Sequence, residues 1–153
     1  MSIPILTACA GFLLAVLWMD LMFDSQAGLR GAPPDESAVG SIAAYYRRAT
    51  TTSQPMGTLI AVVMGVLLVG LGIEAWRGDQ PGWVLIASVV LAGGPILVAM
   101  LHTVPSAVRL GRRDGAPAEQ IRLARAIYRD HVACITGMAL FLLLWLTVVV
   151  RSY

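Results

Sequence analysis

The chain has 153 residues, of which 58% are hydrophobic and 13% charged, and its mean hydropathy is +0.75. This composition lies far from that of soluble domains and indicates an integral membrane protein. The eleven basic residues are all arginine, and nine acidic residues bring the formal net charge to only +2. Because acids are interleaved among the arginines, we expect membrane lipids and no nucleic acid as partners.

Four apolar stretches are long enough to cross a bilayer, which needs about 20 helical residues. They are rich in Leu, Val, Ala and Gly, and they lack the alternating pattern of about ten residues that membrane barrels show. We therefore predict an all-α, polytopic membrane protein in which residues 1–153 form a single four-helix transmembrane bundle. The predicted spans are residues 3–23, 57–76, 83–108 and 128–150.

The distribution of arginine predicts the orientation of the bundle. Two long connections, residues 24–56 and 103–132, hold nine of the eleven arginines. Cytoplasmic loops of multi-pass proteins carry such an excess. Both long connections are therefore predicted to face the cytoplasm, and both termini and the turn at residues 77–82 are predicted to lie outside.

Two similar segments suggest an internal repeat. The segment that holds Tyr46-Arg47 precedes the second span, and the segment that holds Tyr128-Arg129 precedes the fourth. Each half then reads as span, loop, short amphipathic helix, span, so two parallel helical-hairpin repeats are one interpretation. The other interpretation is that tyrosine and arginine are favoured at any membrane interface.

Small residues recur at four-residue spacing in several spans, a pattern typical of close helix packing in lipid. Gly93-Gly94-Pro95 frees a backbone carbonyl in the third span and allows a bend. Glu74, near the outer end of the second span, is expected to be solvated. The predicted packing seams are Gly57/Ala61/Gly65, Gly11/Ala15 and Ala133/Gly137.

Ionisable residues gather at one depth near the predicted cytoplasmic ends. A rise of about 1.5 Å per residue places Asp20, His102 and His131 about 4–10 Å inside the boundary, on three different helices. Such groups are unfavourable in lipid, so we expect them to face the bundle interior or water. Asp20 and Asp24 share a face of the first span, and His102 and Arg109 share a face of the third.

Three interpretations of this layer are open. In the first, Asp20 or Asp24 pairs with a histidine or with Arg109, and the network holds the helices together. In the second, the layer is a pocket for a lipophilic compound, with His131 or His102 as acid or base and Asp20 orienting it. In the third, it holds a metal through His102, His131, Asp20 and Asp24, or a haem between the histidines. No cofactor is favoured, because no ligand pair on one helix has the spacing of a known metal motif.

Three short motifs lie at defined places between the spans: Tyr45-Tyr46-Arg47-Arg48-Ala49 running to Pro55-Met56, Val104-Pro105-Ser106-Ala107-Val108-Arg109-Leu110, and Tyr128-Arg129-Asp130-His131. Their order resembles the anthrone-oxygenase-like family of small four-span membrane proteins. Relative to the family pattern the chain keeps Pro105, Arg109, Leu110 and His131, and it has Ala107 in place of an asparagine and Cys134 in place of an arginine.

The resemblance implies a bacterial inner-membrane protein that oxidises a lipophilic aromatic compound without a cofactor. His131 would be the base that removes a proton from the substrate. Arg109 or Tyr128 would stabilise the enolate oxygen that forms. His102 or Asp20 would tune His131. Two alternatives from other classes stay open: a non-enzymatic subunit that packs against a larger membrane complex or another copy of the chain, and a small oligomeric transporter.

Overall fold

The computed structural model describes residues 2–28, 34–52 and 54–151, and nearly all of them are helical, with no β-strand in these ranges. Four helical stretches are long and apolar enough to cross a membrane. Each contains a predicted span and extends beyond it, so the predicted all-α multi-pass bundle is confirmed. The four stretches are Ile3–Ala27, Pro55–Arg77, Gly82–Arg112 and Pro117–Val150.

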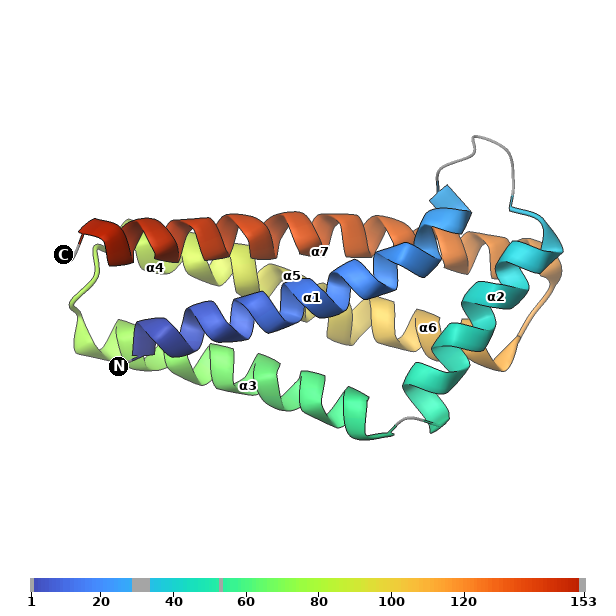
Figure 1. Cartoon of the computed structure of the whole chain (residues 1–153), viewed down its shortest axis with the longest axis horizontal. Helices are drawn as coiled ribbons and strands as arrows, with labels where there is room; N and C mark the ends of the chain where they lie inside the picture. Colours follow the sequence, from blue (N-terminus) through green and yellow to red (C-terminus); the bar gives the residue numbers. More distant parts are fainter. Residues whose placement is uncertain (1, 29–33, 53, 152–153) are drawn as a thin grey trace.

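The helices form an elongated bundle in which both termini lie at one end (Figure 1). The turn between α3 and α4 lies at that same end, whereas α2, the end of α6 and the start of α7 lie at the opposite end. The two long connections therefore share one end, as predicted. The helices are α1 Ser2–Gly28, α2 Glu36–Arg47, α3 Gln54–Arg77, α4 Gly82–Ser88, α5 Gly94–Val98, α6 Val104–Arg112 and α7 Pro117–Arg151.

The third span is divided into α4, α5 and α6 by two π-helical stretches, Val89–Gly93 and Ala99–Thr103. Each π-helical stretch lies just before a proline, Pro95 or Pro105. Proline has no N–H, so it interrupts the helical hydrogen bonds at these points and favours a local change in winding. Helix α7 packs against this segment, where the Sγ of Cys134 donates a hydrogen bond to the carbonyl oxygen of Pro95 at 3.6 Å.

The buried apolar side chains form two separate clusters. The membrane cluster joins α1 and α3 to the third span and to α7, and it includes Leu6, Leu67, Ala92, Phe141 and Trp145. The end cluster joins α2, α6 and the first turns of α7, and it includes Ile42, Leu110, Leu123 and Ile127. Apolar side chains at a spacing of three and four residues place α2 on this cluster, because Val39, Ile42, Ala43 and Tyr46 fall on one face of the helix.

The close helix contacts only partly follow the predicted seams. A Cβ atom at Gly137 would lie 2.9 Å from the carbonyl oxygen of Leu91, so Gly137 lies at a close helix contact, whereas Ala133 of the same predicted seam is exposed. Gly65 has no atom within 4 Å of such a position, and its stripe is exposed. A Cβ atom at Gly70 would lie 2.9 Å from a side-chain carbon of Leu6, so α3 packs tightly on α1 at this glycine instead. The stripes that face outward, against prediction, are Gly57/Ala61/Gly65 and Gly11/Ala15.

Two further expectations differ from the structure. Glu74 is buried, with only 3% of its surface exposed, so the prediction that it is solvated was wrong. Glu74 lies on the face of α3 that packs inward, so it is buried although it is near the end of the helix. The two halves of the chain also differ, because the segment before the fourth span is not a separate helix but the first turns of α7.

Candidate functional site

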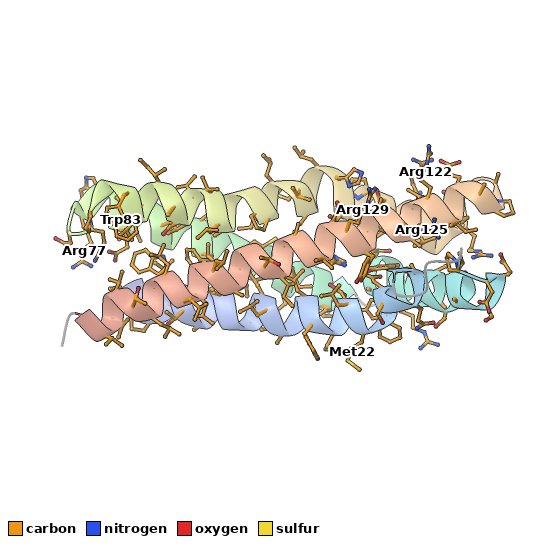
Figure 2. All side chains as sticks on the ribbon, turned by 90° about the horizontal axis from the view of Figure 1, so that it is seen from above. Met22, Arg77, Trp83, Arg122, Arg125 and Arg129 are labelled. Carbon is orange, nitrogen blue, oxygen red and sulfur yellow. The ribbon has the colours of Figure 1, made fainter. Side chains whose placement is uncertain are left out.

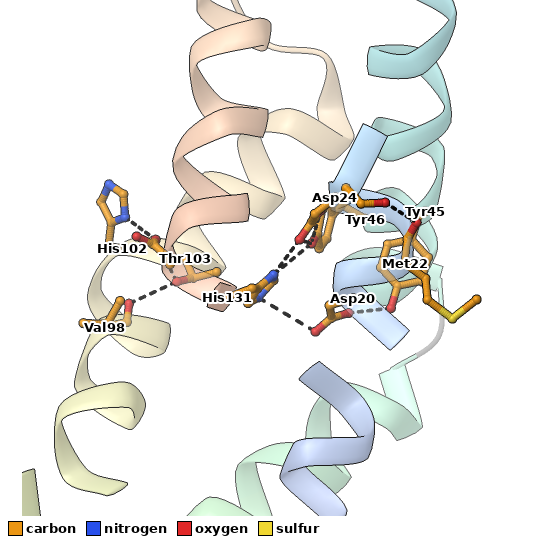
Figure 3. A network of polar contacts seen from close by, with 11 residues as sticks. Asp20, Met22, Asp24, Tyr45, Tyr46, Val98, His102, Thr103 and His131 are labelled. Carbon is orange, nitrogen blue, oxygen red and sulfur yellow. Dashed lines mark hydrogen bonds and ion pairs between the residues drawn. The ribbon is translucent and has the colours of Figure 1, made fainter. Parts of the chain in front are cut away.

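A polar network lies between the two apolar clusters, where the last turns of α1 meet α2 and α7 (Figure 3). Asp20 and Asp24 lie four residues apart on α1 and therefore share one face of that helix. Tyr45 and Tyr46 end α2, and His131 lies on α7. We call these five residues the polar network.

His131 and Asp24 form the centre of the network. The Nδ1 of His131 lies 2.6 Å from the Oδ2 of Asp24, and Asp24 has no exposed surface. The hydroxyl of Tyr46 donates to both carboxylate oxygens of Asp24, at 2.8 and 2.9 Å, and lies 3.4 Å from the Nδ1 of His131. A carboxylate buried in apolar surroundings is tolerated when it is hydrogen-bonded in this way.

Asp20 forms the second part of the network. The hydroxyl of Tyr45 donates to the Oδ1 of Asp20 at 2.5 Å. The Tyr45 ring stacks on Phe23, with ring centroids 4.1 Å apart and an interplanar angle of 10°. The Oδ2 of Asp20 lies 3.8 Å from the Nε2 of His131, which is longer than a hydrogen bond. His131 therefore has a carboxylate on each side of its ring but is bonded to only one of them.

Burial and the aspartates together keep the two tyrosine hydroxyls protonated. Burial raises the pKa of the Tyr46 hydroxyl far above its ordinary value of about 10, and the negative charges of Asp24 and Asp20 raise it further. Burial also raises the pKa of Tyr45, as does its hydrogen bond to Asp20. Both tyrosines are thus fixed as hydrogen-bond donors over the physiological pH range.

The arrangement around His131 is suited to proton transfer. Because a carboxylate accepts but does not donate, we infer that the neutral ring carries its proton on Nδ1, towards Asp24. The Nε2 atom then has a free lone pair and lies out of hydrogen-bond distance of Asp20. An imidazole held on one nitrogen by a carboxylate and free on the other is the usual form of a histidine base.

His102 is at the predicted level but in a different environment. Its Nδ1 lies 2.5 Å from the Oδ2 of Asp130, to which Thr103 also donates a hydrogen bond at 2.9 Å. The His102 side chain is 57% exposed. Figure 3 shows His102 on one side of α7 and His131 with the aspartates of α1 on another. The structure therefore does not bring His102 together with His131.

Arg109 and Tyr128 also lie apart from the centre of the network. Arg109 is ion-paired with Glu119, at the far end of the bundle. Tyr128 is half-buried and lies one turn before His131 on α7. The hydroxyls that reach the aspartates instead come from Tyr45 and Tyr46. The sequence did indicate the position of Tyr46, because this residue continues the apolar stripe of α2, and such a stripe faces the protein interior.

The metal interpretation finds no further support in the geometry. Among the described residues no group of three or more histidine, cysteine, aspartate or glutamate side chains is arranged to hold a metal ion. Cys9 and Cys134 are free and buried. The four candidate ligands are divided instead between two places, with Asp20, Asp24 and His131 in the polar network and His102 beside Asp130.

The fold and the polar network define a class, that of multi-pass helical membrane proteins with a histidine–aspartate pair buried near one end of the bundle. Comparisons with known proteins add no closer relationship, since no protein-family model, curated protein or solved structure matches the chain.

Proposed function

We propose that the polar network is a proton-transfer site that acts on a lipophilic aromatic compound, as in an anthrone-oxygenase-like enzyme without a cofactor. The observation that carries this proposal is the pairing of His131 with Asp24 through Nδ1, which leaves the Nε2 atom without a hydrogen bond. Intramembrane ionisable residues are by default candidates for function. The resemblance in the motifs around Tyr45 and His131 supports the same reaction class.

The proposed reaction begins with proton abstraction. The Nε2 of His131 removes a proton from an acidic methylene of the substrate, and Asp24 stabilises the imidazolium that forms. The electron-rich carbanion reacts with molecular oxygen, and loss of water from the adduct leaves a ketone. Overall, one methylene group and one oxygen molecule give one carbonyl group and one water, so no electron donor is needed.

The tyrosines replace the enolate stabilisers that the sequence suggested. Tyr45 and Tyr46 are donors held at the site, whereas Arg109 is paired elsewhere with Glu119. A hydroxyl that turns from an aspartate to the substrate oxygen stabilises the developing negative charge. Asp20, 3.8 Å from Nε2, is placed to receive the proton that His131 has taken up.

The test is oxygen consumption by the purified protein with anthrone as the probe. His131→Gln and Asp24→Asn are expected to lower turnover by about a hundredfold or more, because general-base catalysis contributes roughly that factor. His102→Gln is the matched control, because this histidine pairs with Asp130 outside the network and its loss should leave turnover unchanged. Turnover that survives His131→Gln in folded protein would refute the proposal.

We also propose that the arginine-rich end faces the cytoplasm of a bacterial inner membrane. The support is the arginine asymmetry between the two ends of the bundle. Alkaline phosphatase fused after residue 153 should be active and a green fluorescent protein at the same place should be dark. The reverse pattern would invert the orientation.

A second candidate function is that of a non-enzymatic subunit. The observation that favours it is the exposed stripe of Gly57, Ala61 and Gly65, a spacing that allows another helix to approach closely. Gly65→Leu should then abolish co-purification of one stoichiometric partner. A transporter with Asp20 as proton carrier is the third candidate, and proton-coupled uptake that is lost in Asp20→Asn would support it.

A further inference from the structure

Helix α7 presents one continuous exposed face along most of its length. Its exposed residues recur at intervals of three and four, so they fall on a single side of the helix. The opposite side is buried against α1 and the third span. The exposed series is Arg122, Arg125, Arg129, Val132, Thr136, Leu140 and Leu143, and the buried series includes Ile127, His131, Cys134, Phe141 and Trp145. The exposed face therefore changes from cationic to apolar between Arg129 and Val132.

The length of the apolar part matches a bilayer. From Val132 to Val150 the helix rises about 27 Å, close to the hydrocarbon thickness of about 30 Å. Arg129 then lies at the level of the lipid headgroups. The other end of the bundle carries the aromatic side chains expected at a second interface, since Trp76 and Trp83 are both exposed there. Figure 2 shows Arg122, Arg125 and Arg129 towards one end of the molecule, and Arg77 with Trp83 at the other.

We infer that this face of α7 binds an anionic phospholipid, with its phosphate among Arg122, Arg125 and Arg129. One acyl chain lies along Val132 and Leu140, and the lipid belongs to the leaflet at the arginine-rich end. The backbone rises about 10 Å from Arg122 to Arg129, and arginine binds phosphate through paired hydrogen bonds. The positive charge of the arginines thus complements the anionic headgroup, and the apolar face next to them contacts the acyl chain.

The arginines of α6 lie in a different setting from those of α7. Arg109 is ion-paired with Glu119, and Arg113 with Glu36. Arg122 also lies 3.6 Å from Glu119, but its side chain stays 75% exposed. The winding of the third span also changes at Ala99–Thr103, so the face that carries the arginines of α6 does not continue along one regular α-helix, as the exposed face of α7 does.

The test is lipid binding measured by native mass spectrometry on the purified full chain. Dioleoyl phosphatidylglycerol and dioleoyl phosphatidylcholine differ in charge but not in acyl chains. We expect the anionic lipid to bind about tenfold more tightly or better, since each arginine near an anionic headgroup contributes roughly fivefold. The triple variant Arg122→Gln, Arg125→Gln, Arg129→Gln should lose this preference. The single variants Arg125→Gln and Arg129→Gln should each lose several-fold.

The matched control removes the same charge from the same end of the bundle. The triple variant Arg109→Gln, Arg112→Gln, Arg113→Gln should keep the lipid preference within about twofold. An equal loss in both triple variants would overturn the inference in favour of a diffuse attraction between the basic end and any anion. Equal binding of the two lipids by the native chain would also overturn it, as would full displacement of the lipid by glycerol phosphate at the same concentration.

Discussion

Asp24 is a carboxylate without exposed surface at the point where three helices meet. Its oxygens accept hydrogen bonds from Tyr46 on α2 and from His131 on α7. In an apolar interior each of these partners is needed, because any one of them left alone becomes a buried polar group without a hydrogen bond. The network therefore links α1, α2 and α7.

We predict that Asp24→Ala destabilises the protein by about 3 kcal/mol, because it leaves a histidine and a tyrosine without their acceptor. Asp24→Asn keeps an acceptor oxygen and should cost about 1 kcal/mol. Reversible unfolding in mixed micelles measures both values. Equal stability of Asp24→Ala and the native chain would show that the network does not hold the helices together.

The raised pKa values of Tyr45 and Tyr46 predict how the protein responds to alkali. In the folded protein both hydroxyls stay protonated above their ordinary pKa of about 10, whereas the unfolded chain ionises there. Their contribution to stability is therefore fully present below about pH 10 and is lost as the pH rises beyond it. The variant with Tyr45→Phe and Tyr46→Phe should show the same tyrosinate absorbance as the native chain at pH 11 while both are folded. A smaller absorbance in the variant would contradict the prediction.

At the scale of elements, a tight contact of α7 with the third span depends on the lack of a side chain at one position. A Cβ at Gly137 would lie 2.9 Å from both the carbonyl oxygen of Leu91 and the Cγ of Pro95. Neither atom can move easily, because one belongs to the backbone and the other to a proline ring. The glycine thus allows α7 to pack against a segment that proline has already distorted.

We predict that Gly137→Ala lowers the free energy of unfolding by about 1–3 kcal/mol, the range typical of overpacking. Gly65→Ala is the matched control, since a methyl group there meets no atom within 4 Å and improves helix propensity. Unfolding of the two variants under the same conditions compares them directly. A Gly137→Ala protein as stable as Gly65→Ala would mean that the two helices can move apart freely.

At the scale of the whole molecule, we expect the membrane cluster and the end cluster to lie in two different environments, lipid for the first and water for the second. Helix α7 has 35 residues, which correspond to about 52 Å, well above a hydrocarbon thickness of about 30 Å. Its first turns belong to the end cluster with α2 and α6. We therefore expect the bundle to extend beyond the bilayer at its arginine-rich end, with the polar network near the membrane boundary.

We predict that hydrogen exchange in lipid nanodiscs divides α7 into two parts. Residues 117–128 should exchange measurably, because water reaches the end cluster, whereas residues 132–150 should stay protected by lipid. Mass spectrometry of peptic peptides resolves the two segments. Uniform protection over the whole of α7 would place the end cluster inside the membrane instead.

The sequence by itself determined the class and the gross arrangement of this protein. Runs of about 20 apolar residues have few alternatives to spanning helices, because lipid offers no hydrogen bonds to the backbone. Periodicity likewise placed Asp20 and Asp24 on one face of α1, and residue counting placed Asp20, His102 and His131 at similar depth. These features depend on local geometry along a single helix, which spacing alone describes.

Only the tertiary structure decided which side chains meet. His102 and His131 are at similar depth, but the rotation of each helix about its axis directs His102 to Asp130 and His131 to Asp24. That rotation is set by packing, such as the approach of α7 to the third span at Gly137. The outward-facing glycines of α3 and the buried Glu74 have the same cause. The depth of a residue in the bundle follows from counting residues along its helix. The direction in which its side chain points depends on how that helix packs against its neighbours.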